Sequence, residues 1–211
     1  MNKKLLAGLL VLAFATLACG LPTTSDSNVL FQDDFSDTGS GWYTSSDSDG
    51  LMDYSNGVFD MQVYTSDLLL FTTANQNLQS DVVIDVDTFK AGGPDDNAFG
   101  VICRYVDPDN FYFFIISSDG YAGVAKYENN ELYVITESGQ MDYTEVITQG
   151  ASSNHITASC IGSTLTLTVN GTQLYSITDT SFSRGDVGFV AKSFSIGGVD
   201  INFDNLVVTK P

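Results

Sequence analysis

The stretch NAFGVICRYVDPDNFYFFIISSDGYAGVAKY, residues 97–127, decides how the chain folds. It holds two apolar and aromatic runs joined by residues 106–110, and a tight turn at Asp119-Gly120 then leads into a third run. Runs of about five to eight such residues, bounded by turn residues, predict successive antiparallel β-strands. We expect these three strands to form the centre of a sheet.

The side chains that share a face of this sheet follow from the period of two along a strand. Pairing Tyr105 with Phe111 across the first turn sets Arg104 opposite Tyr112. One face would then be core, and the other would be either a solvated outer surface or the floor of a binding groove. The expected core face carries Phe99, Val101, Cys103, Phe111, Phe113 and Ile115, and the other face carries Ile102, Arg104, Tyr112 and Phe114.

The rest of the chain repeats the strand pattern. Of the 211 residues 43% are apolar, which is enough for one full core, and nothing marks a second globular domain. Beyond residue 28 there are about thirteen short runs with turns every eight to twelve residues or so, and none has a helical period. Asn170-Gly171 between two alternating runs is a strong hairpin signal. The sequence predicts an all-β, two-sheet antiparallel sandwich over residues 29–211.

The N-terminal segment differs in kind from the domain. Lys3 and Lys4 precede an apolar segment, residues 5–17, that is too short to span a bilayer, which predicts a signal peptide over residues 1–18 and export. The segment ends in Thr-Leu-Ala-Cys19, which resembles the lipobox of bacterial lipoproteins. We expect lipidation of Cys19 and anchoring at the outer face of a membrane in the cell envelope, with ordinary cleavage after Ala18 as the alternative. Residues 19–28 are small and polar, as in a flexible tether.

The charge balance restricts the partners. The formal net charge is −18, and loss of Lys3 and Lys4 would leave six basic residues against 26 acidic ones, a net charge of −20. Such a charge repels phosphate backbones and anionic headgroups, so we exclude nucleic acid and expect membrane contact only through the N-terminal lipid. Neutral glycans and cations remain compatible. Most of the acids are aspartates in turns, and turn chemistry with solubility also explains the charge.

Two cysteines remain after Cys19, and both lie in predicted strands: Cys103 and Cys160. In a compartment that permits disulfides we expect them to be bonded, provided that their strands lie side by side or face each other across the sandwich. Two free buried thiols are the alternative.

Five segments carry a likeness to a known fold: residues 33–42 (DDFSDTGSGW), 100–121, 165–171 (LTLTVNG), 185–191 (GDVGFVA) and 203–208 (FDNLVV). Together they resemble the concanavalin A-like lectin and glucanase jelly rolls, and more narrowly the laminin-G-like branch that includes the 3-keto-disaccharide hydrolase domain. The likeness covers residues 29 to 210 and implies a curved sandwich whose concave face, in many members, holds saccharide. It says little about activity, because one scaffold hosts lectins, adhesion modules and glycosidases.

The glycosidase chemistry of this fold requires two carboxyl groups that flank the scissile bond. The resembling glucanases place theirs in a strand patterned Glu-x-Asp-x-x-Glu. The nearest stretch, residues 81–87 (DVVIDVD), has no glutamate, and Asp85 and Asp87 alternate as on a solvent-facing strand. The only histidine, His155, stands at a strand start without a motif, so we interpret it as a surface residue.

The resemblance also implies a structural calcium ion near the paired terminal strands, held by one acid from each strand. Asp34 and Asp204 occupy those places, with Asp33 and Asn205 beside them. Carboxylate and carbonyl oxygens from several segments suit this hard cation. The alternative is that these residues simply end their strands.

Arg104 and Tyr112 are the predicted ligand-binding residues, with Lys126 from the third run as a further candidate. Arginine offers sugar hydroxyls a planar fork of donors, and tyrosine offers a ring face and a hydroxyl. Trp42 is expected to pack under the opening loop. We therefore expect a surface-tethered carbohydrate-binding or adhesion module. The alternatives are a glycoside or 3-keto-disaccharide hydrolase and an interaction domain without a small ligand.

Overall fold

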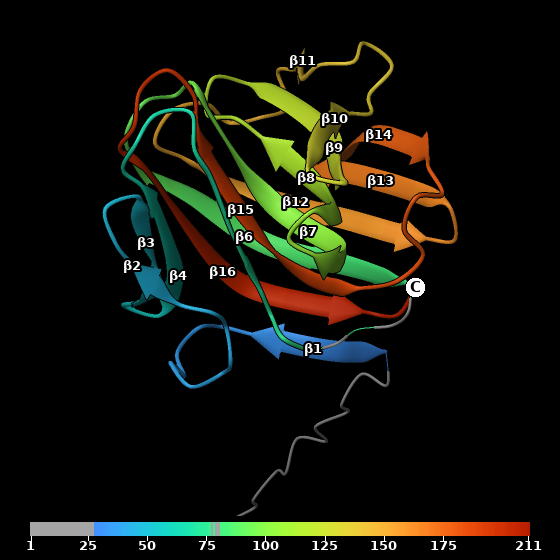
Figure 1. Cartoon of the computed structure of the whole chain (residues 1–211), viewed down its shortest axis with the longest axis horizontal. Helices are drawn as coiled ribbons and strands as arrows, with labels where there is room; N and C mark the ends of the chain where they lie inside the picture. The colour runs from blue at the N-terminus through green and yellow to red at the C-terminus, as the bar shows by residue number, and fades with distance from the viewer. Residues whose placement is uncertain (1–27, 77, 79–80) are drawn as a thin grey trace, which may run out of the picture.

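Two antiparallel β-sheets pack face to face (Figure 1) and confirm the predicted all-β sandwich. The computed structural model describes residues 28–211 except 77, 79 and 80. The predicted signal peptide, the lipidation site at Cys19 and nearly all of the tether lie outside these residues. In the described part of the chain, no helix has the length and apolar character needed to cross a membrane.

The larger sheet, sheet A, has nine strands within the described residues. One of them, β1 (Val29–Asp33), pairs with β16 (Val199–Thr209), the last strand of the chain (Figure 1). The order of the other strands is β14 (Thr172–Thr178), β13 (Thr164–Val169), β12 (Ser153–Ile161), β6 (Val82–Gly92), β16, β4 (Val58–Val63), β3 (Gly50–Ser55) and β2 (Ser45–Ser46). β1 and β4 pair with different halves of β16. Because β1 is the first strand and β16 the last, the two ends of the domain lie side by side in this sheet.

The smaller sheet, sheet B, has seven strands within the same residues, and residues 97–127 supply its centre as predicted. The order is β10 (Glu131–Val134), β9 (Tyr121–Glu128), β8 (Asn110–Ile116), β7 (Asn97–Asp107), β15 (Asp186–Ser193) and β5 (Leu69–Thr73), with β11 (Asp142–Tyr143) paired to β9.

The predicted register of β7 against β8 is wrong by one residue. Cys103 pairs with Tyr112, and the next pair is Asp107 with Asn110, so β7 has three residues where β8 has only Phe111. Arg104, at the start of this irregularity, has a φ of 54°. Extra residues on one strand locally disrupt the ladder and re-aim the side chains around them.

This register change exchanges the faces of β8. Tyr112, Phe114 and Ile116 point into the core between the sheets, together with Cys103. Phe111, Phe113 and Ile115, which we expected in that core, lie on the outer face of sheet B with Ile102. The shared outer face predicted for Arg104 and Tyr112 does not form.

The core between the sheets is rich in aromatic rings. Trp42 stacks on Phe189, with ring centroids 4.4 Å apart, and Phe189 stacks on Phe203 at 4.2 Å. The Trp42 indole donates a hydrogen bond from Nε1 to Asp33 Oδ2 at 3.0 Å, so its one polar atom is satisfied although the ring is buried. This placement agrees with the predicted packing of Trp42.

A disulfide joins Cys103 on β7 to Cys160 on β12 and so links the two sheets. The Cα atoms are 6.8 Å apart, and both side chains are fully buried. The predicted pairing is confirmed, and it takes the form in which the two strands face each other across the sandwich.

We expect removal of this disulfide, by reduction or by Cys103→Ala with Cys160→Ala, to lower the free energy of unfolding by about 4 kcal/mol, because it closes a loop of 57 residues in the unfolded chain. Urea unfolding with and without a reductant measures the difference. The reductant should leave the double variant unchanged, and equal unfolding midpoints for the oxidised and reduced wild-type protein would contradict the prediction.

Candidate functional site

Arg104 lies inside one end of the sandwich and is 1% exposed. Its Nη2 donates to Asp81 Oδ1 at 3.0 Å and to the Gly162 carbonyl at 2.7 Å, and its Nη1 donates to the Phe182 carbonyl at 2.9 Å. These acceptors come from three separate segments of the chain. Arg104 therefore fastens the end of sheet A and the segment after β14 to β7.

Tyr112 and Lys126 meet at a single carboxylate, that of Asp179. Tyr112 Oη donates to Asp179 Oδ1 at 2.5 Å, and Lys126 Nζ donates to Asp179 Oδ2 at 3.1 Å. The backbone N–H of Phe182 in turn donates to Tyr112 Oη at 3.1 Å. The structure thus brings all three predicted ligand residues together, and they surround residues 179–182 of the protein itself.

The contact of Arg104, Tyr112 and Lys126 with a ligand stays a prediction, and their placement does not favour it. Tyr112, like Arg104, is fully buried, and the side chain of Lys126 is 11% exposed. Most of their polar atoms form hydrogen bonds with other groups of the protein. The outer faces of the two sheets carry the other candidate residues.

The outer face of sheet B is apolar and forms a floor with a rim. The floor consists of Ile102, Phe111, Phe113, Ile115 and Val190, whose exposed fractions lie between 0% and 6%. The rim is half-buried and packs against this floor; it includes Phe71, Tyr105, Tyr127, Met141 and Phe194.

Phe111 is the centre of this face. Its ring centroid lies 5.2 Å from that of Phe71, 5.6 Å from Tyr105 and 5.3 Å from Tyr127. The flanking side chains therefore close over the centre of this outer face. We call the outer face of sheet B the aromatic face.

The two rim tyrosines add hydroxyl groups to the aromatic face. Burial raises the pKa of Tyr127 above its ordinary value, and burial with the nearby carboxylates of Asp107 and Asp109 raises that of Tyr105. Both hydroxyls are therefore neutral at physiological pH. Each can donate or accept a hydrogen bond.

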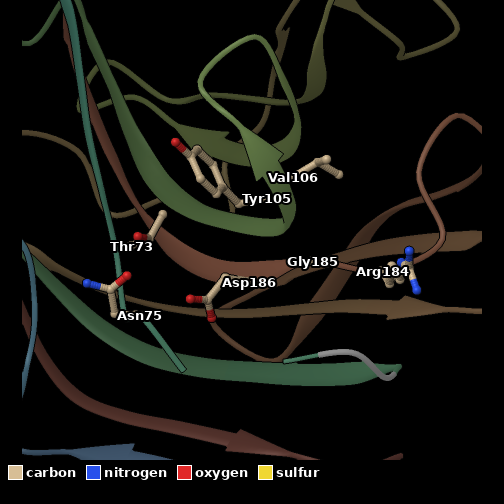
Figure 2. A pocket seen from close by; sticks show the side chains of 7 residues that line it. All are labelled: Thr73, Asn75, Tyr105, Val106, Arg184, Gly185 and Asp186. Carbon is tan, nitrogen blue, oxygen red and sulfur yellow. The ribbon is translucent and has the colours of Figure 1, made fainter. Parts of the chain in front are cut away.

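Two cavities lie at the ends of the aromatic face. One has a volume of about 410 Å³. Figure 2 shows Thr73, Asn75, Tyr105 and Asp186 gathered around it, with Arg184 farther away. The other, about 320 Å³, is lined by Asp96, Asn97, Ser117, Asp119, Tyr121, Met141 and Phe194. The strand β7 reaches from one cavity to the other, so the face is elongated, roughly 26 Å between Asn97 and Tyr105 at about 3.3 Å per residue.

The outer face of sheet A is polar instead, and it carries the acids that the sequence singled out. β6 and β12 pair so that His155 stands opposite Asp87. His155 Nδ1 lies 2.7 Å from Asp87 Oδ1, and Nε2 lies 3.5 Å from Asp85 Oδ1. Thr157 Oγ1 donates to Asp85 Oδ1 at 2.6 Å. His155 is a surface residue as predicted, but it belongs to an Asp-His-Asp group that sequence reasoning missed, because only strand pairing brings residues 68 positions apart together.

The acids predicted to hold calcium lie near the β1–β16 pairing. Asp34 accepts hydrogen bonds from the Ser36 hydroxyl and backbone, which lower its pKa, and it lines a cavity together with Asp33 and Asn205. Asp204 lines a different cavity, which also includes Asn205. Within residues 28–211, the gaps excepted, no group of three or more His, Cys, Asp or Glu side chains is arranged to hold a metal ion. Calcium at Asp34 and Asp204 stays a prediction.

No family model and no curated protein matches the chain, whereas many solved structures share its fold. The carbohydrate-binding module CBM66 from Bacillus subtilis superimposes with a TM-score of 0.56 and 17% identity, over 81% of this chain and 96% of that one. The β-glucanase of Bacillus licheniformis gives 0.57 and 10%, over 86% and 98%. A Bacillus subtilis protein of unknown function with a galectin-like fold gives 0.62 and 8%, over 86% and 96%. The chain has the concanavalin A-like jelly-roll fold.

Carbohydrate-binding modules and glycoside hydrolases both use this jelly roll, so at these identities the likeness shows the fold alone. The narrower resemblance to the 3-keto-disaccharide hydrolase domain stays a prediction.

Asp179 should give this jelly roll a pH-dependent stability. Burial would raise its pKa, but hydrogen bonds from Tyr112, Ser181 and Lys126 outweigh burial and lower the pKa from 3.8 to about 2. The carboxylate therefore stabilises the fold above about pH 4, and this contribution is lost as the pH falls through about 2. Asp179→Asn should lower the free energy of unfolding by about 1–2 kcal/mol at pH 7, and by less as the pH approaches 2.

Urea unfolding at pH 7 and at pH 2.5 tests this expectation. Asp109→Asn, which removes the same charge from an exposed turn, is the matched control and should change stability little at either pH. An equal loss for Asp179→Asn at both pH values would show that the stabilisation does not come from its charge.

Proposed function

We propose that this protein binds a neutral glycan chain along the aromatic face of sheet B without cleaving it. The observation that carries the proposal is the half-buried pair Tyr105 and Tyr127, which flank Phe111 on the aromatic face. A sugar ring has an apolar face of C–H groups that packs on an aromatic ring, and its hydroxyls require hydrogen-bonding partners. The half-buried rings and the hydroxyl groups of Tyr105 and Tyr127 offer both.

The end cavities support an extended ligand. Thr73, Asn75 and Asp186 offer a hydroxyl, an amide and a carboxylate group at one end, and Ser117 and Asp119 offer a hydroxyl and a carboxylate group at the other. A polymer lying along β7 would reach both cavities, whereas a single sugar would occupy one. The net charge of −20 expected for the exported chain disfavours anionic glycans and agrees with a neutral one.

Binding without hydrolysis is supported by the chemistry of the floor. Glycoside hydrolysis requires two carboxyl groups on either side of the scissile bond. The floor residues are all apolar. Asp85 and Asp87 lie on the outer face of sheet A, and packed sheets are about 10 Å apart, so these acids are out of reach of a glycan on the aromatic face.

The solved structure of a carbohydrate-binding module with the same fold supports this function. With the lipid expected at Cys19, the aromatic face would be held at the surface of the cell envelope and would retain a polysaccharide there.

We expect Tyr105→Ala and Tyr127→Ala each to weaken glycan binding about tenfold, roughly 1.4 kcal/mol, because each removes one ring of the face. A glycan array with the purified protein identifies the ligand, and calorimetric titration then measures the affinity of each variant. Tyr127→Phe keeps the ring and removes only the hydroxyl, so it should lose less than Tyr127→Ala.

Phe89→Ala is the matched control, since Phe89 is 41% exposed on the outer face of sheet A. It should leave the affinity unchanged. Affinity that is insensitive to both tyrosines, or no binding to any neutral polysaccharide, would contradict the proposed function.

A further inference from the structure

Asp60 on β4 is a buried carboxylate with an unpartnered oxygen. The residue is 7% exposed, and its Oδ2 accepts a hydrogen bond from Gln62 Nε2 at 2.7 Å. Its Oδ1 is buried and has no hydrogen-bond partner among the described residues. Buried polar atoms in proteins are nearly always paired, so an unpaired carboxylate oxygen indicates that an ion or a water completes the site.

The strands on either side of β4 bring two more carboxylates to this point. Asp60 pairs with Asp53 on β3 and with Asn202 on β16, and Asp200 is the next residue of β16 on the same face. This is the outer face of sheet A, because Phe59 and Met61 on β4 point into the core. Asp200 lies within hydrogen-bonding reach of the Asp60 carboxyl group.

Among the residues that the structure describes, no cationic side chain pairs with these acids. The ion pairs among the described residues belong to Lys90, Arg104, Lys126 and His155, and each of them joins a carboxylate elsewhere. The negative charges of Asp200 and Asp53 repel that of Asp60. A cation between the carboxylates would remove the repulsion and partner the free oxygen.

We propose that Asp60 and Asp200 bind a hard divalent cation, Ca²⁺ or Mg²⁺, on the outer face of sheet A. Asp60 Oδ1 and one oxygen of Asp200 are the protein ligands, and Asn202 offers an amide oxygen on the same face. Water completes the shell, as is usual for hard cations held by one or two carboxylates. This site differs from the one predicted at Asp34 and Asp204.

The test is thermal unfolding of the purified protein at pH 7.5, after treatment with a chelator, in the presence of calcium chloride or magnesium chloride. At a concentration about a hundred times the Kd, the bound cation should raise the Tm of the wild-type protein by about 5–10 °C. Asp60→Asn and Asp200→Asn should each abolish this rise.

Asp34→Asn and Asp204→Asn are the matched controls, since they remove the same charge from the other predicted site, and both should keep the part of the rise that depends on Asp60 and Asp200. Asp60→Asn should also melt no lower than wild type without cations, because it removes a buried charge, so its loss of response is not a failure to fold. The proposal is overturned if neither cation raises the Tm of the wild type, if the rise persists in Asp60→Asn and Asp200→Asn, or if Asp204→Asn abolishes it instead.

Discussion

The backbone conformation at Arg104 sets the register of β7 against β8, and the rest of the structure depends on this register. Its positive φ begins the irregularity of β7, and this shifts the pairing with β8 by one residue. Tyr112 and Cys103 therefore point into the core, where Cys103 meets Cys160 of the opposite sheet. The guanidinium of Arg104 reaches three acceptors at the end of the sandwich, so a strained backbone conformation is held in place by buried, charge-assisted hydrogen bonds.

The same shift creates the surface that we propose for glycan binding. Phe111 and Phe113 leave the core and occupy the outer side of sheet B, where their burial comes from neighbouring side chains and not from a second sheet. The residues predicted to bind a sugar hold residues 179–182, and residues expected in the core lie on the outer face of sheet B. The outer face of sheet B thus carries apolar rings, and the outer face of sheet A carries aspartates.

Several features of the site could not be read from the sequence, for a common reason. A one-residue slip in register moves every following side chain to the other face, and no local pattern distinguishes Arg104 as the place where a strand gains residues. The Asp-His-Asp group and the acids around Asp60 depend on which strands become neighbours. β6 pairs with β12 and β16, and β4 pairs with β16, all distant in the chain.

The sequence by itself determined the all-β sandwich, the position of its central strands and the partners of the disulfide, because alternation, turn residues and a single pair of domain cysteines are local or countable properties. Tertiary structure alone decided which side chains form the aromatic outer face of sheet B, where the charged groups meet, and which acceptors Arg104 reaches. These outcomes depend on strand order and register, which are set by the packing of the whole sandwich.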